Sequence, residues 1–225
     1  MSNPYFYCML KDGLLNKKFK YTYSNAAMYL VMVNVLVYML VNYANIRIKG
    51  LPLIYWLGLI PGCVNMGWVW QFFTYMFVHS SFSHLLFNML GLIMFGQLLE
   101  RAVGTREFLL FYFVCGVLGG VVSYVFYLLQ GALASVIIGA SGSIYALLFL
   151  AAVLFPQARV LLFFFIPMKM PIAVMVFIAI ELFDQIVGLN GGVAHLIHLS
   201  SIAVAWLYCL VRFRLNPVQV WKENL

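Results

Sequence analysis

The stretch GASGSIY at positions 139–145 places a polar serine, Ser141, among glycines at the start of an apolar run that continues to Pro156. Gly139 and Gly142 keep bulk away from the Ser141 hydroxyl. The first turn of a helix carries unpaired backbone N–H groups at the positive end of the helix dipole. Such donors suit a developing oxyanion, so Ser141 is a candidate nucleophile at the start of a buried helix. Small residues at this spacing also occur where membrane helices touch, so the stretch by itself fits a packing role as well.

The composition of the whole chain indicates the solvent in which it folds. Of the 225 residues, 65% are apolar and only 8% are charged, which is more apolar surface than one soluble core can bury. We therefore predict a polytopic membrane protein. The four cysteines are far apart and show neither metal-binding nor disulfide-framework spacing. The first 25 residues lack a short apolar core followed by a small-residue cleavage site, so no cleavable signal is expected.

Apolar runs separated by helix breakers predict an all-α bundle of six transmembrane helices. We expect these helices at about 26–45, 84–99, 108–130, 141–155, 172–187 and 193–211. The segment 46–83 is rich in tryptophan and phenylalanine but is interrupted by prolines and glycines, which predicts a membrane-embedded loop of short interfacial helices between helices 1 and 2. Residues 1–25 and 212–225 are basic tails, and 26–211 form the membrane domain.

The distribution of basic residues predicts the orientation of these helices. Six spans bring both termini to one side of the membrane. Of the 13 lysines and arginines, all but Arg47 and Lys49 then fall on that side, which the positive-inside rule identifies as cytoplasmic. The second, fourth and sixth spans therefore run inward from the outer surface. Each of them begins with a polar residue, namely His84, Ser141 and His195.

These three polar residues are predicted to lie at one depth in the membrane. They stand 17, 18 and 17 residues before the first cytoplasmic arginine of their spans, which are Arg101, Arg159 and Arg212. At a rise of about 1.5 Å per residue, each lies roughly 25 Å above the cytoplasmic edge of a hydrocarbon core that is about 30 Å thick. A shared depth is expected of a site built from three helix N-termini, and it favours a functional role over separate packing roles.

The chemistry of these residues suggests a role for each. Ser141 is predicted to be the nucleophile and His195 its general base. Because no aspartate lies at that depth, the two would form a two-residue variant of the serine–histidine site. His84 and Asn88 are four residues apart on one helix face and are expected to donate, with the Ser141 amide, to an oxyanion. Tyr145, one turn below Ser141, is expected to support the imidazole of His195.

Taken together, these motifs resemble those of the rhomboid intramembrane serine proteases over nearly the whole chain. The shared features are Gly-Ala-Ser-Gly with a tyrosine four residues after the serine, His79-x4-His84-x3-Asn88 before it, and Ala194-His195 after it. The resemblance implies a catalytic dyad of Ser141 and His195. It also implies an oxyanion hole made by His84, Asn88 and the Ser141 amide.

The resemblance further implies where the protein works and on what. Trp70 and His79 would belong to the embedded loop, while Gly139, Gly142 and Tyr145 would support the nucleophile. The expected substrates are single-span membrane proteins cut within or near their membrane helix, and the expected partners are these substrates and the bilayer, with no nucleic acid, metal or cofactor. The expected location is the bacterial inner (cell) membrane, with both termini cytoplasmic.

Two departures from the family pattern bear on this expectation. The usual Trp-Arg of the loop is Trp70-Gln71 here. The glycines that normally follow the catalytic histidine at its third and seventh positions are His198 and Ile202, counting from His195. These larger side chains put the spacing of the fourth and sixth spans in question. We expect His198, about 4.5 Å deeper and rotated by roughly 60°, to be a buried structural group.

Other function classes fit the sequence less well. An inactive rhomboid-like protein that binds membrane clients without cleaving them is the main alternative. A metalloprotease would require carboxylates or paired histidines on one face, and the chain contains no His-Glu-x-x-His motif. A transporter or channel would be favoured by paired charges within the spans. Glu181 and Asp184, however, lie near the outer end of the predicted fifth span.

Overall fold

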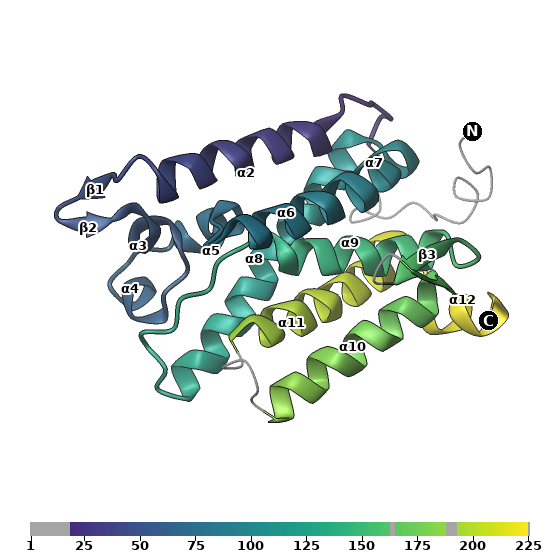
Figure 1. Ribbon diagram of the computed structural model, residues 1–225. Helices are drawn as coiled ribbons and strands as arrows, with labels where there is room; N and C mark the ends of the chain where they lie inside the picture. The colour runs from purple at the N-terminus through teal and green to yellow at the C-terminus, as the bar shows by residue number, and fades with distance from the viewer. Residues whose placement is uncertain (1–18, 163–164, 188–192, 225) are drawn as a thin grey trace.

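The computed structural model describes residues 19–162, 165–187 and 193–224, which form a bundle of helices (Figure 1). A helix lies at each of the six predicted positions, which confirms the predominantly helical fold. The main helices are α2 (Ala26–Asn42), α6 (Phe82–Gly91) continued by a π-helical turn η3 (Leu92–Gly96) and α7 (Gln97–Val103), α8 (Thr105–Leu129), α9 (Ser141–Leu154), α10 (Met170–Val187), and α11 (Val193–Tyr208) continued by a second π-helical turn η4 (Cys209–Phe213).

Length and composition separate these helices into two groups. Four continuous helical segments are long and apolar enough to cross a membrane: Phe82–Val103, Thr105–Leu129, Met170–Val187 and His195–Phe213. The other two apolar helices are shorter, since α2 has 17 residues and α9 has 14. The predicted six-helix order is therefore present, while α2 and α9 are shorter than a typical span of about 20 residues.

Residues 46–83 fold as a compact loop that packs on the bundle. The loop contains a two-stranded hairpin of β1 (Arg47–Ile48) and β2 (Leu51–Pro52), the short helices α3 (Leu53–Leu57), α4 (Pro61–Asn65) and α5 (Gln71–Thr74), and a 3-10 turn η2 (Tyr75–Phe77). Gln71 is fully buried in this loop. Its Oε1 accepts from the Ile60 amide at 3.0 Å and its Nε2 donates to the Tyr55 carbonyl at 2.8 Å. Glutamine can therefore hold the loop together at the position where the family pattern has arginine.

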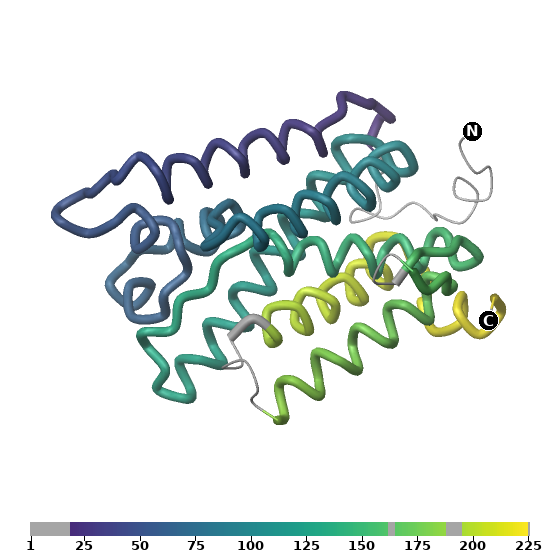
Figure 2. Tube along the Cα trace, viewed as in Figure 1, coloured from purple at the N-terminus to yellow at the C-terminus, as the bar shows by residue number. Residues whose placement is uncertain are grey.

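Helix α9 occupies the centre of the bundle and contacts α8, α10, α11 and the turn η3. In Figure 2 it runs between α6 on one side and α11 on the other. All residues from Gly142 to Val153 are buried except Tyr145. A helix that is apolar on every face is stable only when it is enclosed, so this composition accounts for its central position.

Small residues allow α8, α9 and α11 to approach closely. A Cβ atom added to Gly142 would lie 2.7 Å from Ser201 Oγ and 3.1 Å from Ile197 Cγ1. A Cβ atom on Gly119 of α8 would lie 2.2 Å from the same Ser201 oxygen. Ser200 Oγ also donates to the Gly119 carbonyl at 3.1 Å. The two glycines therefore bring α11 close to the start of α9, and this proximity positions the candidate site.

The start of the described chain and the end of η4 lie at the same end of the bundle. The Tyr21 hydroxyl donates to the Arg101 carbonyl at 3.1 Å, and the Arg212 guanidinium lies 5.1 Å from the centre of the Phe19 ring. The β1–β2 hairpin, which carries Arg47, lies at the opposite end (Figure 1). Arg101 and Arg212 therefore lie at one end of the bundle and Arg47 at the other.

Two glutamates stabilise the helix ends at this basic side. The fully buried Glu100 accepts hydrogen bonds from the amides of Ala26 and Ala27 at 2.8 and 3.0 Å. It thereby caps α2 with a negative charge at the positive end of its dipole. Glu107 forms an ion pair of 2.7 Å with Arg212, which ties α8 to η4.

The connector after α9 and the C-terminal tail are more ordered than the sequence analysis expected. The connector forms an antiparallel hairpin of β3 (Arg159–Leu162) and β4 (Ile166–Lys169), so the fold contains short strands besides its helices. The tail includes α12 (Pro217–Asn224), which packs on α9. The Trp221 indole donates to the Ala152 carbonyl at 3.1 Å. This contact satisfies a carbonyl near the C-terminal end of α9, where no further helical N–H donors follow.

Candidate functional site

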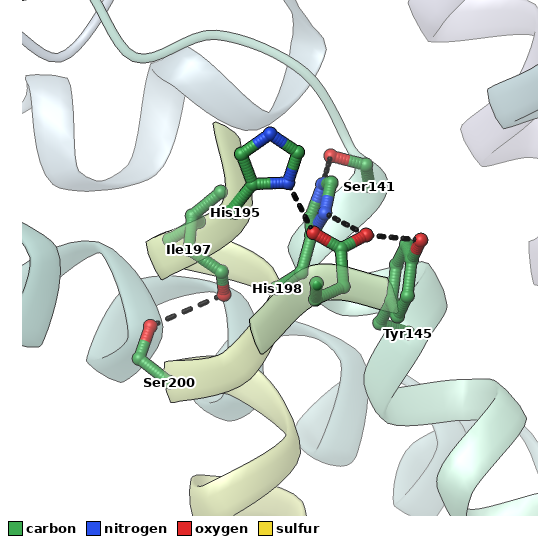
Figure 3. A network of polar contacts seen from close by, with 7 residues as sticks. Ser141, Tyr145, His195, Ile197, His198 and Ser200 are labelled. Atoms are coloured by element: carbon green, nitrogen blue, oxygen red, sulfur yellow. Dashed lines mark hydrogen bonds and ion pairs between the residues drawn. The ribbon is translucent and has the colours of Figure 1, made fainter. Parts of the chain in front are cut away.

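The candidate site is centred on Ser141, the first residue of α9. Its Oγ lies 2.6 Å from Nε2 of His198 in the second turn of α11, which is a hydrogen bond between two helices (Figure 3). The His198 side chain is 12% exposed. A serine hydroxyl within hydrogen-bonding distance of a mostly enclosed imidazole is the arrangement that a nucleophile and its general base require.

The predicted pairing of Ser141 with His195 is therefore corrected. His195 turns toward α10, where its Nδ1 lies 2.6 Å from Oε2 of Glu181. Its Nε2 has no hydrogen-bond partner among the described residues. The depths predicted from the rise per residue are those of the Cα atoms and not of the side-chain ends. Side chains of a helix lean toward its N-terminus, so an imidazole one turn deeper can reach up to the level of Ser141.

A signal in the sequence distinguishes the two histidines. The family pattern has glycines at the third and seventh positions after the catalytic histidine. Counted from His198, these positions are Ser201 and Ala205, which are both small and fully buried. Counted from His198, serine and alanine therefore replace the glycines, which is a smaller change than the histidine and isoleucine found when counting from His195. If His198 is the histidine of the pattern, the small residues that follow it allow α11 to approach α9 closely.

Glu181 also belongs to this cluster, although it was not among the predicted site residues. This residue lies on α10, is 5% exposed, and has both carboxylate oxygens engaged. Oε1 lies 2.9 Å from Nδ1 of His198 and also accepts a hydrogen bond from the Tyr145 hydroxyl. Oε2 lies beside His195. A carboxylate inside an apolar helix is itself a signal of function, because an unpaired charge is costly in a membrane.

Tyr145 supports the imidazole of His198 rather than that of His195. The two rings are stacked, with centroids 4.3 Å apart and an angle of 10° between their planes. Tyr145 lies one helical turn after Ser141, so both side chains face α11 (Figure 3). The prediction that Tyr145 supports His195 is therefore corrected, because the ring stacked on the tyrosine is that of His198.

His84 of α6 lies beside Gly139, two residues before the serine. Gly139 has a φ angle of +114°, and a Cβ atom at this position would lie 2.7 Å from Nε2 of His84 and 3.8 Å from Oγ of Ser141. The imidazole therefore fills the space that a side chain at position 139 would take. The turn that begins α6 is fixed by Ser81, whose Oγ accepts from the His84 amide at 3.2 Å. Gly139 is thus required both for its backbone conformation and for room.

Two further donors belong to this side of the site. Asn88 is buried one turn beyond His84 on α6, and its Nδ2 donates to the His84 carbonyl at 2.7 Å, which leaves one of its two amide hydrogens for another acceptor. The amide of Ser141 starts α9 and has no carbonyl four residues earlier in that helix. The second helix and the start of the fourth thus carry N–H groups that suit an anionic oxygen.

The predicted loop residues take separate positions. His79 is fully buried, and its ring lies 4.9 Å from the ring of His84 at an angle of 67°, so it supports His84 by packing. Trp70 is 42% exposed and stacks with Trp68 and Trp56 at ring distances of 5.5 and 6.4 Å. Trp70 therefore belongs to an aromatic cluster of the loop. Amphipathic rings of this kind favour the membrane–water interface.

An apolar cavity of about 890 Å³ is lined by Tyr145 of the site. It lies between α9, α10 and the continuous helix formed by α6, η3 and α7. Ile144 and Tyr145 form part of its wall. Met94 of η3, Arg159 of β3 and Phe177 of α10 also line it. Residues 19–162, 165–187 and 193–224 contain no group of three or more His, Cys, Asp or Glu side chains suited to hold a metal ion.

Part of the chain is similar in sequence to known proteins. The family model described as the Rhomboid domain matches residues 66–215, which is about two thirds of the chain. YdcA of Bacillus subtilis (strain 168), whose name places it among the rhomboid proteases, is 38% identical over 86 residues, which are 38% of this chain and 41% of that protein. Rhomboid protease GluP of the same organism is 36% identical over 85 residues, covering 38% of this chain and 16% of GluP.

A plant protein shares a longer stretch with the chain. RHOMBOID-like protein 12, mitochondrial, of Arabidopsis thaliana is 31% identical over 152 residues, covering 59% of this chain and 44% of that protein. Each match spans less than half the length of the relative concerned.

Proposed function

This chain belongs to the rhomboid family of integral membrane proteins, and we propose that it is a serine endopeptidase that cleaves transmembrane proteins within or near their membrane-spanning segment. The observation that carries the proposal is the 2.6 Å contact between Ser141 Oγ and His198 Nε2 at the start of a buried helix. The names of YdcA and GluP, which both contain the words rhomboid protease, support the reaction class.

In the first chemical step, Ser141 attacks the carbonyl carbon of the scissile peptide bond. Nε2 of His198 takes the hydroxyl proton as the bond from Oγ to carbon forms, and the carbonyl oxygen becomes an oxyanion. His198 replaces His195 as the proposed base because it is the histidine within hydrogen-bonding distance of the hydroxyl.

The oxyanion is proposed to receive hydrogen bonds from three sources. These are the Ser141 amide, Nε2 of His84 and the side-chain amide of Asn88. The position of the His84 ring beside Gly139 and close to the serine supports this assignment. The Ser141 amide also lies at the positive end of the α9 dipole. Donors fixed before the reaction stabilise the charge without reorganising, which is a large contribution to catalysis by such sites.

The second half of the reaction regenerates the enzyme. The His198 imidazolium gives its proton to the leaving amine as the peptide C–N bond breaks, which leaves an ester on Ser141. A water molecule then attacks this ester while His198 takes a proton from the water. When the bond from carbon to Oγ breaks, the proton returns to the Ser141 oxygen and the new carboxylic acid leaves.

The apolar cavity between the second helix, α9 and α10 supports a membrane-embedded substrate. Its wall includes Tyr145, which stacks on the proposed base, so a segment that enters from the lipid side approaches the serine. A substrate helix satisfies its backbone hydrogen bonds internally, and the scissile bond must unwind before it can be attacked. We expect small or helix-breaking residues near the cleavage site.

The proposed setting is the bacterial cell membrane, with both chain ends in the cytoplasm. The supporting observation is the excess of basic residues at the end of the bundle that carries Arg101 and Arg212, opposite the hairpin with Arg47. Under the positive-inside rule the basic end faces the cytoplasm. The nucleophile then lies nearer the outer surface.

The direct test is cleavage of a single-span substrate by the purified full chain in liposomes. We expect cleavage by the wild type and none by Ser141→Ala. Ser143→Ala is the matched control, because this second serine of α9 donates to the Tyr112 carbonyl at 2.9 Å instead of to a histidine. A fluorophosphonate probe is expected to label Ser141 alone. Undiminished cleavage by Ser141→Ala overturns the assignment, and wild-type protein that binds substrate without cutting it identifies an inactive client-binding relative.

A further inference from the structure

Glu181 occupies a position that a serine–histidine pair alone does not require. The carboxylate comes from α10, whereas Ser141 and His198 belong to α9 and α11. Its side chain is 6% exposed. We propose that Glu181 is a positioning residue that holds His198 in the tautomer able to accept the Ser141 proton, and that His195 in turn holds Glu181. This inference rests on the proposed function.

The contacts of His198 leave its ring little freedom. Nε2 meets Ser141 Oγ at 2.6 Å, and Nδ1 meets Glu181 Oε1 at 2.9 Å. Tyr145 covers one face of the ring at a centroid distance of 4.3 Å. Because a neighbour engages each of the two nitrogens, rotation of the ring would break two hydrogen bonds at once. The imidazole is therefore fixed in position before any substrate enters.

The carboxylate also selects the position of the imidazole proton. An ionised carboxylate only accepts hydrogen bonds, so Nδ1 of His198 must carry the hydrogen. Nε2 then has a free lone pair directed at the Ser141 hydroxyl. When Oγ–H breaks and Nε2–H forms, His198 becomes an imidazolium whose positive charge lies against the Glu181 carboxylate. The carboxylate stays ionised throughout, as in other serine–histidine–acid sites.

His195 and Tyr145 explain how a carboxylate can remain charged at this depth. Burial of an ionised group is unfavourable unless donors surround it. Glu181 receives a hydrogen bond from the Tyr145 hydroxyl on Oε1, and it contacts Nδ1 of His195 at 2.6 Å on Oε2. Together with His198, three side chains from two helices face the carboxylate. His195 thus contributes to the site through Glu181 and does not contact the serine.

The kinetic test compares substitutions of two acidic residues on α10. Glu181→Gln keeps the shape of the side chain, but its amide can donate to Nδ1 and favour the wrong tautomer. We expect kcat to fall about 10²- to 10⁴-fold with KM changed less than about threefold, by analogy with loss of the orienting acid in a serine protease triad. Asp184→Asn is the matched control, since Asp184 bonds neither histidine within the described ranges, and we expect its kcat to stay within about twofold.

A conservative replacement sharpens the kinetic test. Glu181→Asp keeps the charge but shortens the side chain by one methylene, so we expect kcat between those of the wild type and Glu181→Gln. A kcat of Glu181→Gln equal to that of Asp184→Asn would overturn the inference. So would equal losses in Glu181→Asp and Glu181→Gln accompanied by equal losses of thermal stability, because that outcome indicates a role in folding only.

A second measurement reads the tautomer directly and does not depend on cleavage. The chain has only four histidines, so ¹⁵N-histidine labelling gives four imidazole spin systems, and His198→Gln identifies the one of interest. In resting Ser141→Ala we expect hydrogen on Nδ1 and a bare Nε2 at His198. In the double variant, which carries Glu181→Gln as well as Ser141→Ala, His198 should no longer prefer the hydrogen on Nδ1. If His198 carries its hydrogen on Nε2 in the Ser141→Ala protein, the inference is overturned, even if Ser141-dependent cleavage is established. Conversely, failure of cleavage with the expected tautomer counts against the proposed function alone.

Discussion

Ser141 and His198 lie 57 residues apart in the sequence, yet Oγ of the serine lies 2.6 Å from Nε2 of the histidine. The contact depends on two glycines at which α11 approaches its neighbours, Gly142 on α9 and Gly119 on α8. Ser201, one turn after His198, lies against both of them. The geometry of the proposed reaction therefore depends on close helix packing beneath the site.

The two histidines of α11 are expected to differ sharply on substitution. His198→Ala removes the proposed base, and we expect turnover to fall by at least about 10⁴-fold. His195→Ala removes only a contact to Glu181, and we expect a loss of about 3- to 30-fold, comparable to the loss of one hydrogen bond. Cleavage rates of both variants in detergent and liposomes check this. An active His198→Ala beside an inactive His195→Ala would restore the pairing first expected from the sequence.

Loss of one oxyanion donor is expected to lower turnover more than binding. His84→Ala and Asn88→Ala should each reduce kcat about 10- to 1,000-fold, because each removes a donor to the charge that forms in the transition state. Separate measurement of kcat and KM with a single-span substrate checks the prediction. Full turnover by both variants would exclude α6 from the proposed oxyanion hole.

The close approach of α9 and α11 is expected to be sensitive to a single methyl group. Gly142→Ala introduces a Cβ atom 2.7 Å from Ser201 Oγ, so we expect a loss of about 1–3 kcal/mol of stability and slower cleavage. Ser201→Gly removes the opposing oxygen. The double variant should therefore be more stable than Gly142→Ala, as measured by thermal unfolding in detergent. Purely additive effects of the two changes would show that the two positions do not interact.

The cap of α2 is expected to matter for stability and not for chemistry. Glu100→Ala leaves the amides of Ala26 and Ala27 without their charged acceptor, and we expect a loss of about 2–4 kcal/mol. Glu223→Ala is the control, because Glu223 forms an exposed contact with Gln219 and its loss should change stability by less than about 0.5 kcal/mol. Melting temperatures in detergent compare them. Equal shifts for the two variants would contradict the capping role.

The sequence by itself determined the features that depend on local patterns. Hydropathy and helix breakers predicted a helix at each of six positions, since each apolar run must find an apolar environment whatever its neighbours are. The glycine-flanked motif identified Ser141 at the start of α9, because a helix start is a local property of the chain.

Only the tertiary structure decided which side chains meet. His195 and His198 are three residues apart on one helix, and their roles depend on the rotation of α11 about its axis and on the lean of its side chains. The small residues Ser201 and Ala205 indicate which face of α11 packs closely. They fit the family spacing, however, only when the positions are counted from His198. Glu181 is visible in the sequence as a carboxylate within an apolar helix, but no local pattern shows its partner, because it reaches His198 from a third helix. Hydropathy fixes where each helix lies along the chain, whereas packing at Gly142 and Gly119 fixes which faces come together.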